Sequence, residues 1–227
     1  MKRFDILSLF PEYFEGPFNV SMIKAAREKG ILKINPVNMR DFSSGRYGRI
    51  DDRPYGGGPG MVLMAEPVTK AIRSVKSKRS HVVYLTPQGK PLSAKRCDGL
   101  AKKDHLIILC GHYEGIDERV VLSEVDEEIS IGDYVLTSGC PAAIVLVDSI
   151  ARFIPGVIGN EDAVRQDSFE NGIFDAPTFT RPPLFEEMEV PTVLQNGNHA
   201  EIKAWREKTA REKTERVRPD LIQKLES

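Results

Sequence analysis

The stretch that decides the fold is residues 110–141, which read CGHYEGIDERVVLSEVDEEISIGDYVLTSGCP. An apolar run over 106–110 ends at Gly111, and a second run over 128–131 ends at Gly132. Each pattern predicts a buried strand that stops at a glycine and passes into a polar loop. In open α/β sheets, ligands bind beyond the carboxyl ends of such strands, so the two loops predict one shared crevice.

Upstream of this stretch, strand-like and helix-like segments alternate along the chain. Short apolar runs bounded by turn residues are typical of buried strands, and apolar residues spaced by three or four are typical of helices. The alternation predicts an α/β architecture with a largely parallel sheet. The predicted strands are 3–9, 31–37, 82–85 and 106–110, with the turn signal TPQG at 86–89 after the third, and the predicted helices are 22–29, 66–77 and 93–103.

Residues 40–60 form a segment rich in glycine and arginine that is longer than an ordinary connection. It contains GGGPG at 56–60, but no Lys followed by Ser or Thr comes after the last glycine, so it lacks the phosphate-binding P-loop pattern. One interpretation is a mobile loop that closes over a ligand, with Arg46, Arg49 and Arg53 facing phosphate. The spacing alone favours a structural turn.

Downstream of the opening stretch, the composition changes. Residues 141–153 predict a helix, and residues 159–171 are polar without apolar periodicity, which is typical of a linker. Residues 175–191 are proline-rich and irregular. Asn198 then begins a capping-box pattern that opens a charged helix reaching to about residue 214, and its alternating acids and bases are typical of a solvated ion-pair face.

The 227-residue chain has an ordinary globular composition, 41% hydrophobic and 29% charged, with a formal net charge of −1. Residues 65–105 carry ten Lys or Arg against three Asp or Glu, whereas 110–135 carry eight acids against one arginine. A basic face for a polyanion and a pair of solvated helix faces explain this asymmetry equally well. Three cysteines without C-x-x-C spacing and no secretory leader lead us to expect a reducing, cytoplasmic location, and the charges after Pro141 exclude a membrane span.

Several familiar chemistries find no support in the sequence. The four histidines are scattered, without H-E-x-x-H or paired cysteines, so we predict no metal site, and no G-x-S-x-G motif indicates a serine hydrolase. What remains is a set of charged residues near strand and helix ends. Each of them can be interpreted as a general base or a residue that stabilises charge, or instead as a helix cap or an ordinary surface charge. These are Glu114, Asp117, Asp133, Arg152 and Asp167, with Asp117 placed to cap a helix over 118–124.

Beyond residue types, a series of motifs makes the chain recognisable. It closely resembles the bacterial tRNA (guanine-N1)-methyltransferases of the TrmD type, in the SPOUT superfamily, and the resemblance covers essentially the whole chain. The matching motifs, in the family's order and spacing, are LSLFP (7–11), DDRPYGGGPGM (51–61), YLTPQG (84–89), GHYEGIDER (111–119), SIGDYVLTSG (130–139), DSIARFIPGV (148–157), DSF (167–169), TRP (180–182) and GNHAEI (197–202).

The resemblance implies an α/β fold with a mostly parallel sheet and a deep C-terminal trefoil knot, plus a small, mainly helical C-terminal domain. It implies a SPOUT domain that binds S-adenosylmethionine at 1–158, an interdomain linker at 159–171 and a helical tRNA-binding domain at 172–227. It also implies a homodimer with a shared active site. The implied reaction moves a methyl group from S-adenosylmethionine to N1 of the guanosine immediately 3′ of the tRNA anticodon.

By the same resemblance, Asp167 of the partner subunit removes the N1 proton and Arg152 stabilises the charge that gathers on guanine O6. Glu114 holds the base edge or attracts a divalent ion, because activity in the family depends on Mg²⁺. Residues 40–53 and the helix around 203–211 contact the phosphates of the anticodon stem-loop. The implied cofactor contacts are Tyr84, Leu85, Thr86, Pro87, Gly111, Tyr113, Ile131, Gly132, Tyr134, Leu136, Gly139 and Pro141.

Three positions depart from the family pattern. His112 stands where the family usually has arginine, Phe179 stands where tyrosine is common, and the loop at 137–141 is one residue shorter and lacks the usual second glycine and glutamate. The shortened loop motivates a second hypothesis, a knotted tRNA-binding protein with weakened or no catalysis. A third is a related knotted enzyme that acts on another base or RNA.

Overall fold

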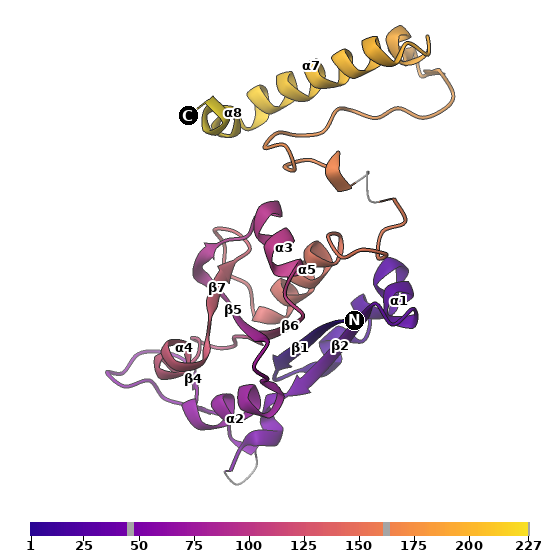
Figure 1. Ribbon diagram of the computed structural model, residues 1–227. Helices are drawn as coiled ribbons and strands as arrows, with labels where there is room; N and C mark the ends of the chain where they lie inside the picture. Colours follow the sequence, from indigo (N-terminus) through magenta and orange to yellow (C-terminus); the bar gives the residue numbers. More distant parts are fainter. Residues whose placement is uncertain (45–47, 161–163, 227) are drawn as a thin grey trace. The chain divides into compact units, whose positions relative to one another are not determined.

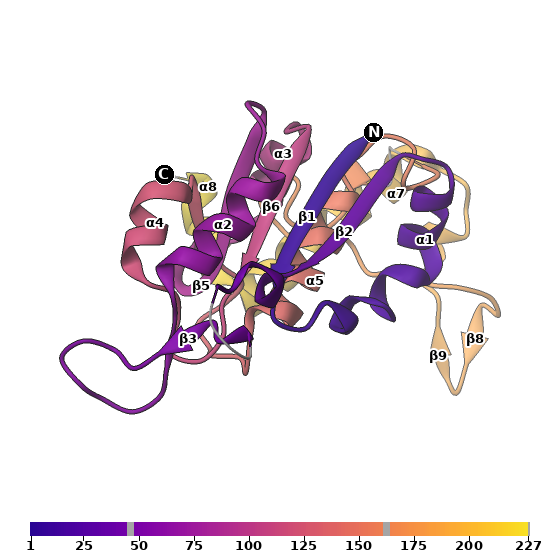
Figure 2. The same ribbon diagram turned by 90° about the horizontal axis from the view of Figure 1, so that it is seen from below.

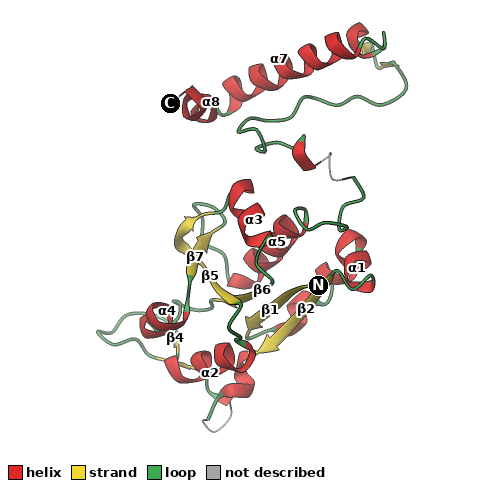
Figure 3. Cartoon of the chain, in the orientation of Figure 1, coloured by secondary structure: helices red, strands yellow, loops and turns green. Residues whose placement is uncertain are grey.

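The computed structural model describes residues 1–44, 48–160 and 164–226. The chain forms two compact units, Met1–Gly159 and Asn160–Ser227, and each is described by itself. The first contains a sheet with helices packed on it, and the second consists of helices and extended segments (Figures 1 and 3). Arg46, one of the arginines proposed to face phosphate, lies outside the described residues, as do positions 161–163 of the predicted linker.

The sheet of the first unit has five strands in the order β2-β1-β6-β5-β7, and all of its pairings are parallel. The predicted α/β fold with a mostly parallel sheet is therefore confirmed. Strand β1 lies between β2 and β6, with Phe4 opposite Ile34 on one side and Leu106 on the other. The strands are β1 (Lys2–Ser8), β2 (Leu32–Asn38), β5 (Ser80–Pro91), β6 (His105–Cys110) and β7 (Glu127–Ser130).

Both faces of the sheet are covered, as Figure 2 shows. Successive side chains of a strand point to opposite faces, so β6 sends Leu106 and Ile108 into one core and Ile107 and Leu109 into the other. The first core also holds α1 (Ser21–Glu28), α3 (Ala94–Ala101) and α5 (Gly139–Ala151), and the second holds α2 (Ala65–Val75) and α4 (Glu118–Glu124). This three-layer arrangement explains why the strands read as continuous apolar runs.

The helix boundaries follow local signals. Ser93, Asp117 and Ser138 each accept a backbone hydrogen bond as N-caps of α3, α4 and α5. The cap predicted for Asp117 is therefore confirmed, and Ser93 caps the helix predicted to begin at that residue. Helix α5 begins at Gly139, two residues before the predicted start at Pro141. Pro141 lies in its first turn, where a missing N–H costs nothing.

The predicted end of the third strand at Leu85 is wrong. Strand β5 continues through 86–89 to Pro91, and both Leu85 and Lys90 pair with Ile129, with a register shift between them. The continuation depends on Gly89, because a β-carbon there would lie 2.6 Å from the carbonyl carbons of Glu128 and Ile129. The segment 40–60 also contains structure, since β3 (Asp51–Asp52) pairs with β4 (Val62–Leu63).

The second unit contains a short hairpin, β8 (Leu184–Phe185) with β9 (Met188–Glu189), and two helices, α7 (His199–Val217) and α8 (Pro219–Glu226). Helix α7 is capped by Asn198 as predicted but runs past residue 214, and α8 is absent from the sequence-based expectations. The i,i+4 ion pairs on α7, such as Arg211 with Glu215 at 2.8 Å, agree with the predicted solvated face. No helix in the described ranges combines the length and apolar character needed to cross a membrane.

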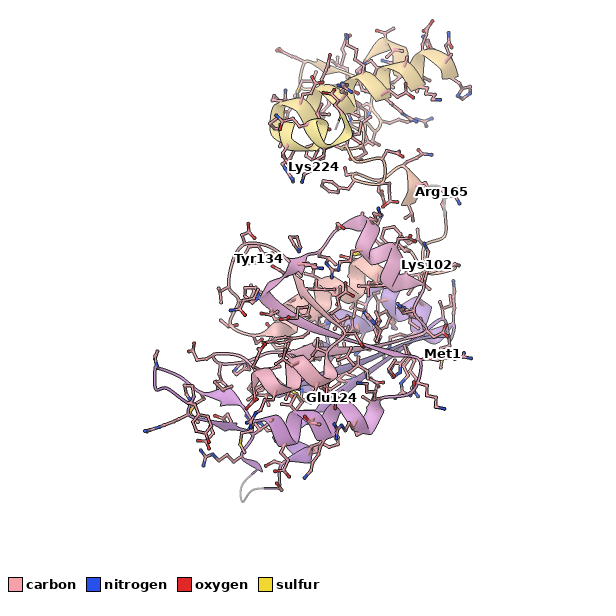
Figure 4. All side chains as sticks on the ribbon, turned by 60° about the vertical axis from the view of Figure 1, so that its left-hand side comes forward. Met1, Lys102, Glu124, Tyr134, Arg165 and Lys224 are labelled. Carbon is pink, nitrogen blue, oxygen red and sulfur yellow. The ribbon has the colours of Figure 1, made fainter. Side chains whose placement is uncertain are left out.

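Glu124 links α4 to α2 and gives a test of the packing of the first unit. Its buried carboxylate, labelled in Figure 4, accepts hydrogen bonds from Arg73 (2.7 Å) and Lys76 (2.9 Å). Burial acts to raise the pKa of Glu124, but these two cations outweigh it and hold the pKa below its ordinary value. Because the pKa of this carboxyl group is lower in the folded protein than in the unfolded chain, its ionised form stabilises the fold at pH values above the unfolded-state pKa. That stabilisation is lost as the pH falls through the folded-state pKa.

We therefore expect Glu124→Gln to lower the free energy of unfolding by about 1–2 kcal/mol at neutral pH, because both cations are partly exposed and can rehydrate. Urea titrations at several pH values should show this difference shrinking in acid, where the wild-type carboxylate takes up a proton. Glu66→Gln is the control, since Glu66 pairs with Lys70 on the exposed surface of one helix. An equal effect of both substitutions would contradict the assigned role of Glu124.

Candidate functional site

The C-terminal end of β6 meets the N-terminal end of α5 at two glycines, Gly111 and Gly139. We call this pair the glycine cradle. The N–H of Gly139 donates a hydrogen bond to the carbonyl of Gly111 at 2.8 Å. A β-carbon at Gly139 would lie 2.8 Å from both Cys110 Cα and Gly111 N, which are backbone atoms that cannot move independently. The position therefore accepts only glycine, because any side chain there would push β6 and α5 apart.

Tyr84 packs against this cradle from β5. A β-carbon at Gly111 would lie 3.2 Å from the Tyr84 hydroxyl, and one at Gly115 would lie 3.6 Å from it. Burial raises the pKa of the Tyr84 hydroxyl, so the phenol is neutral at physiological pH. Tyr84 therefore acts as a rigid, uncharged support for the loop that follows β6.

The loop after β7 borders the same region. The hydroxyl of Ser130 donates to the carbonyl of Gly132 (3.0 Å) and accepts from its N–H (3.2 Å), which fixes the turn. Tyr134 folds back onto Gly132, so that a β-carbon added at Gly132 would lie 2.9 Å from Cζ of the Tyr134 ring. Tyr134, Val135 and Leu136 are exposed apolar side chains (Tyr134 is labelled in Figure 4), which is typical of a surface that covers a ligand or a partner.

Glu114 lies against the glycine-rich segment 56–60. A β-carbon at Gly60, which has a φ of +80°, would lie 2.5 Å from Glu114 Cγ. The two segments are joined further by hydrogen bonds from Glu114 N to the Met61 carbonyl (3.0 Å) and from Leu63 N to the Gly115 carbonyl (2.9 Å). Segment 56–60 is thus the structural turn favoured from sequence, and it also positions a candidate catalytic carboxylate.

His112, one of the departures from the family pattern, lies in an aromatic cluster. Its ring contacts Phe10 (centroids 5.4 Å apart) and Tyr113 (4.4 Å), and Arg40 lies 6.0 Å from the Phe10 ring centroid. Burial, followed by the charge of Arg40, lowers the pKa of His112, so its ring is neutral near pH 7. Its buried Nδ1 has no hydrogen-bond partner among the residues that the structure describes.

The structure brings together the predicted cofactor contacts of the first unit at the carboxyl ends of β6 and β7 and the adjoining part of β5. Leu85 pairs with Cys110 and with Ile129, which puts all three strands side by side at this edge. Leu85 and Thr86 are buried, whereas Pro87 and Tyr113 are exposed. Ile131 packs against the first core, and Pro141 lies in the first turn of α5.

Arg152 does not lie at this edge of its own chain. Arg152 is the C-cap of α5, and Gly139 is the first residue of that 13-residue helix, so about 20 Å of helix separates them. Asp167 belongs to the second unit. Asp117 is the cap of α4 and forms an ion pair with Arg119 at 2.7 Å, so its non-catalytic interpretation is the one that the structure supports.

The second unit has a cavity of about 1480 Å³ between α7 and the extended segment before it. Asp167 lies on its wall together with Arg181 and Arg206. Phe179, on the same wall, has its ring centroid 6.2 Å from that of Trp205. Asp167 was predicted from the sequence as a candidate base, but the cavity was not. The residues on the two sides of the cavity are separated in the chain by irregular sequence.

A Ser-His-Asp relay also exists, at the opposite ends of the strands. His105 Nδ1 lies 2.8 Å from Ser80 Oγ, and His105 Nε2 lies 2.5 Å from Asp5 Oδ2. The Ser80 hydroxyl, however, also accepts the backbone N–H of Ser77 at 2.7 Å and so closes the turn before β5. The relay ties the starts of three strands together and presents no free nucleophile.

Comparison with known proteins places these features in a family. The family model described as tRNA (Guanine-1)-methyltransferase TrmD matches residues 1–224. The tRNA (guanine-N(1)-)-methyltransferase of Protochlamydia amoebophila is 59% identical over 218 residues, which are 96% of this chain and 98% of that protein. The proteins of the same name from Chlamydia muridarum and Chlamydia pneumoniae are 56% and 54% identical over 96% of this chain. The chain spans only 61% and 60% of their lengths. The chain belongs to the tRNA (guanine-1)-methyltransferase TrmD family.

Proposed function

We propose that the protein transfers the methyl group of S-adenosylmethionine to N1 of the guanosine immediately 3′ of the tRNA anticodon. The observation that carries this proposal is the family match over residues 1–224, together with the glycine cradle at the carboxyl edge of the sheet. The three buried thiols agree with a cytoplasmic enzyme.

The glycine cradle suits S-adenosylmethionine, which supplies an electrophilic methyl group on a sulfonium. An adenine ring is read well by main-chain N–H and C=O groups. The absence of side chains at Gly111 and Gly139 lets β6, α5 and Tyr84 pack closely, which fixes the loops that would present such groups to the ligand. The exposed side chains of Tyr134 and Leu136 cover the bound ligand from the solvent side, and Tyr84 supports the loop beneath it. The knotted threading of 1–158 that the family resemblance implies forms part of this proposal.

The acceptor nitrogen must lose its proton before it can take the methyl group. Asp167 removes that proton, and Arg152 stabilises the charge that develops on guanine O6. Because α5 holds Arg152 about 20 Å from the glycine cradle of its own chain, a site that uses both needs a second copy. The proposed enzyme is therefore a homodimer in which each site combines the cradle of one protomer with Arg152 and Asp167 of the other.

Mixing two impaired variants tests this sharing, with S-adenosylmethionine kept too dilute to saturate the weakened cradle. Gly139→Ala damages the cradle, and Asp167→Ala removes the base. In a mixture that has exchanged subunits, some heterodimers combine an intact cradle with an intact Asp167, so activity should rise above that of either variant alone. Activity that does not rise in a mixture shown to contain heterodimers would refute the shared site.

The second unit supplies the surface for the anticodon stem-loop. Arg181 and Arg206 line its cavity, and Phe179 and Trp205 offer ring faces for an unstacked base. Several cations of α7 are paired with glutamates, so tRNA phosphates must compete with these pairs. We expect tRNA affinity to fall steeply with salt.

Mg²⁺ is the proposed auxiliary ion. In the described part of the chain, no group of three or more His, Cys, Asp or Glu side chains is placed to hold a metal. Glu114 is the residue that would attract an ion, and the substrate would complete its coordination. Removal of Mg²⁺ with a chelator should lower methyl transfer without lowering the affinity for S-adenosylmethionine.

The direct test uses labelled S-adenosylmethionine and an unmodified tRNA transcript with guanosine after the anticodon. We expect N1-methylguanosine at that position, located by nuclease mapping, and no label in a matched transcript with adenosine there. If S-adenosylmethionine binds but the first transcript is not labelled, the proposed activity is refuted.

The alternative is a tRNA-binding protein without catalysis, and the shortened loop at 137–141 motivates it. Calorimetry distinguishes the two functions, because an enzyme should give a saturable heat with S-adenosylmethionine and a pure RNA binder should give none. Methylation of another nucleotide would indicate the third hypothesis, a related knotted enzyme.

Gly139→Ala should weaken S-adenosylmethionine binding by at least about tenfold, equivalent to about 1.4 kcal/mol, because its β-carbon forces the backbone of Cys110 and Gly111 apart. Titration calorimetry measures the affinity. Gly16→Ala is the matched control, since Gly16 has helical dihedral angles and nothing within 4 Å of an added β-carbon. Unchanged affinity in the first variant would separate the glycine cradle from cofactor binding.

A further inference from the structure

Two cysteines meet directly behind the glycine cradle. Cys110 is the last residue of β6, and Cys140 is the second residue of α5. Each is only 2% exposed, and both belong to the first core. The residue before Cys140 packs directly on Cys110, since a β-carbon at Gly139 would lie 2.8 Å from Cys110 Cα. The hydrogen bond between Gly139 and Gly111 holds the two backbones together at this point, so the two cysteines stay in neighbouring positions of the core.

The surroundings of the two thiols differ. Cys140 lies in the first turn of a 13-residue helix, its Sγ lies 3.1 Å from Ser8 Oγ, and its N–H bonds to Ser138 Oγ. The neighbouring Cys110 thiol, and then the hydroxyl groups of Ser8 and Ser138, lower the pKa of Cys140 to about 6, against the opposing effects of burial and of Glu12. Burial raises the pKa of Cys110. Cys140 is therefore the member of the pair that ionises more readily, and Cys110 is the one that keeps its proton.

The simpler interpretation is that both cysteines only fill the core, as small apolar side chains do. Packing alone does not account for the hydroxyl beside one sulfur and its place at a helix N-terminus, which both favour a thiolate. Cys97, buried on α3, provides an internal reference for a cysteine outside the pair.

We propose that Cys110 and Cys140 form a modification site, a dithiol that a hydroperoxide oxidises reversibly to a disulfide. The Cys140 thiolate attacks one peroxide oxygen, the O–O bond breaks, and the other oxygen leaves as hydroxide, which takes up a proton to become water. Cys110 then loses its proton and attacks the sulfur of the Cys140 sulfenic acid, and a second molecule of water leaves. Two electrons pass from the two sulfurs to one peroxide, and an added dithiol such as dithiothreitol returns them.

Because both thiols are buried, peroxide reaches them only when the protein opens locally. The proposed opening is in the segment that precedes α5, where Val135 is 81% exposed and Tyr134 is 54% exposed. The resulting disulfide joins β6 to α5 across the glycine cradle and removes the Cys140 sulfur from its bond with Ser8. If the cradle binds S-adenosylmethionine, as the proposed function requires, oxidation changes that site from within.

The test is peptide mapping of the intact protein after brief treatment with hydrogen peroxide near neutral pH, alkylation under denaturing conditions and digestion with trypsin. Cleavage after Lys and Arg puts Cys110 in peptide 104–119, Cys140 in peptide 120–152 and Cys97 in peptide 97–102. We expect a disulfide-linked species of the first two peptides, lighter than their sum by two hydrogen atoms, which dithiothreitol removes. Peptide 97–102 should be recovered alkylated.

Two variants make the outcome specific. Cys110→Ser should leave a Cys140 sulfenic acid that dimedone traps, and Cys140→Ser should leave Cys110 as an unoxidised thiol under the same treatment. Circular dichroism checks that both variants are folded, and the wild-type result stands even where a variant is not. Absence of the linked peptides in wild type, or a link that involves Cys97 instead, would overturn the proposal.

The effect on ligand binding is measured separately, by calorimetry with S-adenosylmethionine on reduced and oxidised wild type. We expect the affinity to fall at least tenfold on oxidation and to return with dithiothreitol. Equal affinities would refute the effect on the cradle. If the reduced protein gives no heat at all, the proposed function fails, while the mapped disulfide remains valid.

Discussion

Asp167→Ala is expected to lower the rate of methyl transfer by about 10²–10⁴-fold while the affinity for S-adenosylmethionine stays close to that of wild type. The rate falls because N1 of guanine keeps its proton without a positioned base. The affinity is retained because the proposed cofactor contacts all belong to the first unit, whereas Asp167 belongs to the second. Single-turnover kinetics with saturating tRNA measure the rate, and calorimetry measures the affinity.

A control carboxylate in the same unit shows whether the loss is specific. Asp220 forms an ion pair with Arg218 at 2.8 Å on the exposed surface, so Asp220→Asn should methylate tRNA at the wild-type rate. If Asp167→Ala lowered cofactor affinity and rate by the same factor, Asp167 would be a structural residue. A rate within a few-fold of wild type would exclude Asp167 as the base.

Gly89→Ala should cost about 3 kcal/mol or more of unfolding free energy, one of the largest effects available from adding a single methyl group. The added β-carbon would lie 2.6 Å from two backbone carbonyl carbons of β7, so β5 and β7 must separate. Urea unfolding followed by circular dichroism measures the change. Tryptophan fluorescence is unsuitable, because the sole tryptophan, Trp205, belongs to the second unit.

Gly99→Ala is the matched control for this substitution. Gly99 lies within α3, and a β-carbon there meets nothing within 4 Å. Alanine is a better helix former than glycine, so this variant should be more stable than wild type by about 0.5–1 kcal/mol. We therefore expect Gly89→Ala to lower the free energy of unfolding and Gly99→Ala to raise it. A Gly89→Ala protein as stable as wild type would contradict the close approach of β5 to β7.

Features set by neighbours in the sequence could be predicted. The caps at Ser93, Asp117 and Asn198 satisfy backbone donors one to three residues away, so a short window of sequence contains the whole interaction. The helix at Pro219–Glu226 has the same kind of local signal, a proline at its first position and Asp220 in its first turn. The prediction that the last helix ends at about residue 214 does not include it.

Features set by distant contacts could not be predicted in this way. The composition of 86–89 is that of a turn, yet the segment stays extended because Gly89 packs on the backbone of Ile129. The contact between Cys110 and Cys140 likewise depends on how β6 and α5 pack. The family resemblance implies that Gly111 and Gly139 both contact the cofactor, but their direct contact was not predicted, since periodicity carries no information about which strand end meets which helix.

The position of β1 inside the sheet has a consequence for synthesis of the protein. Arg3 pairs with His105, so the second partner of β1 leaves the ribosome about a hundred residues after β1 itself. At roughly 5–20 residues per second, the nascent chain waits roughly 5–20 s with one edge of that strand unprotected. Phe4, Ile6 and Leu7, fully buried in the finished protein, are open to other chains during this interval. We therefore expect dependence on molecular chaperones to be concentrated in early translation.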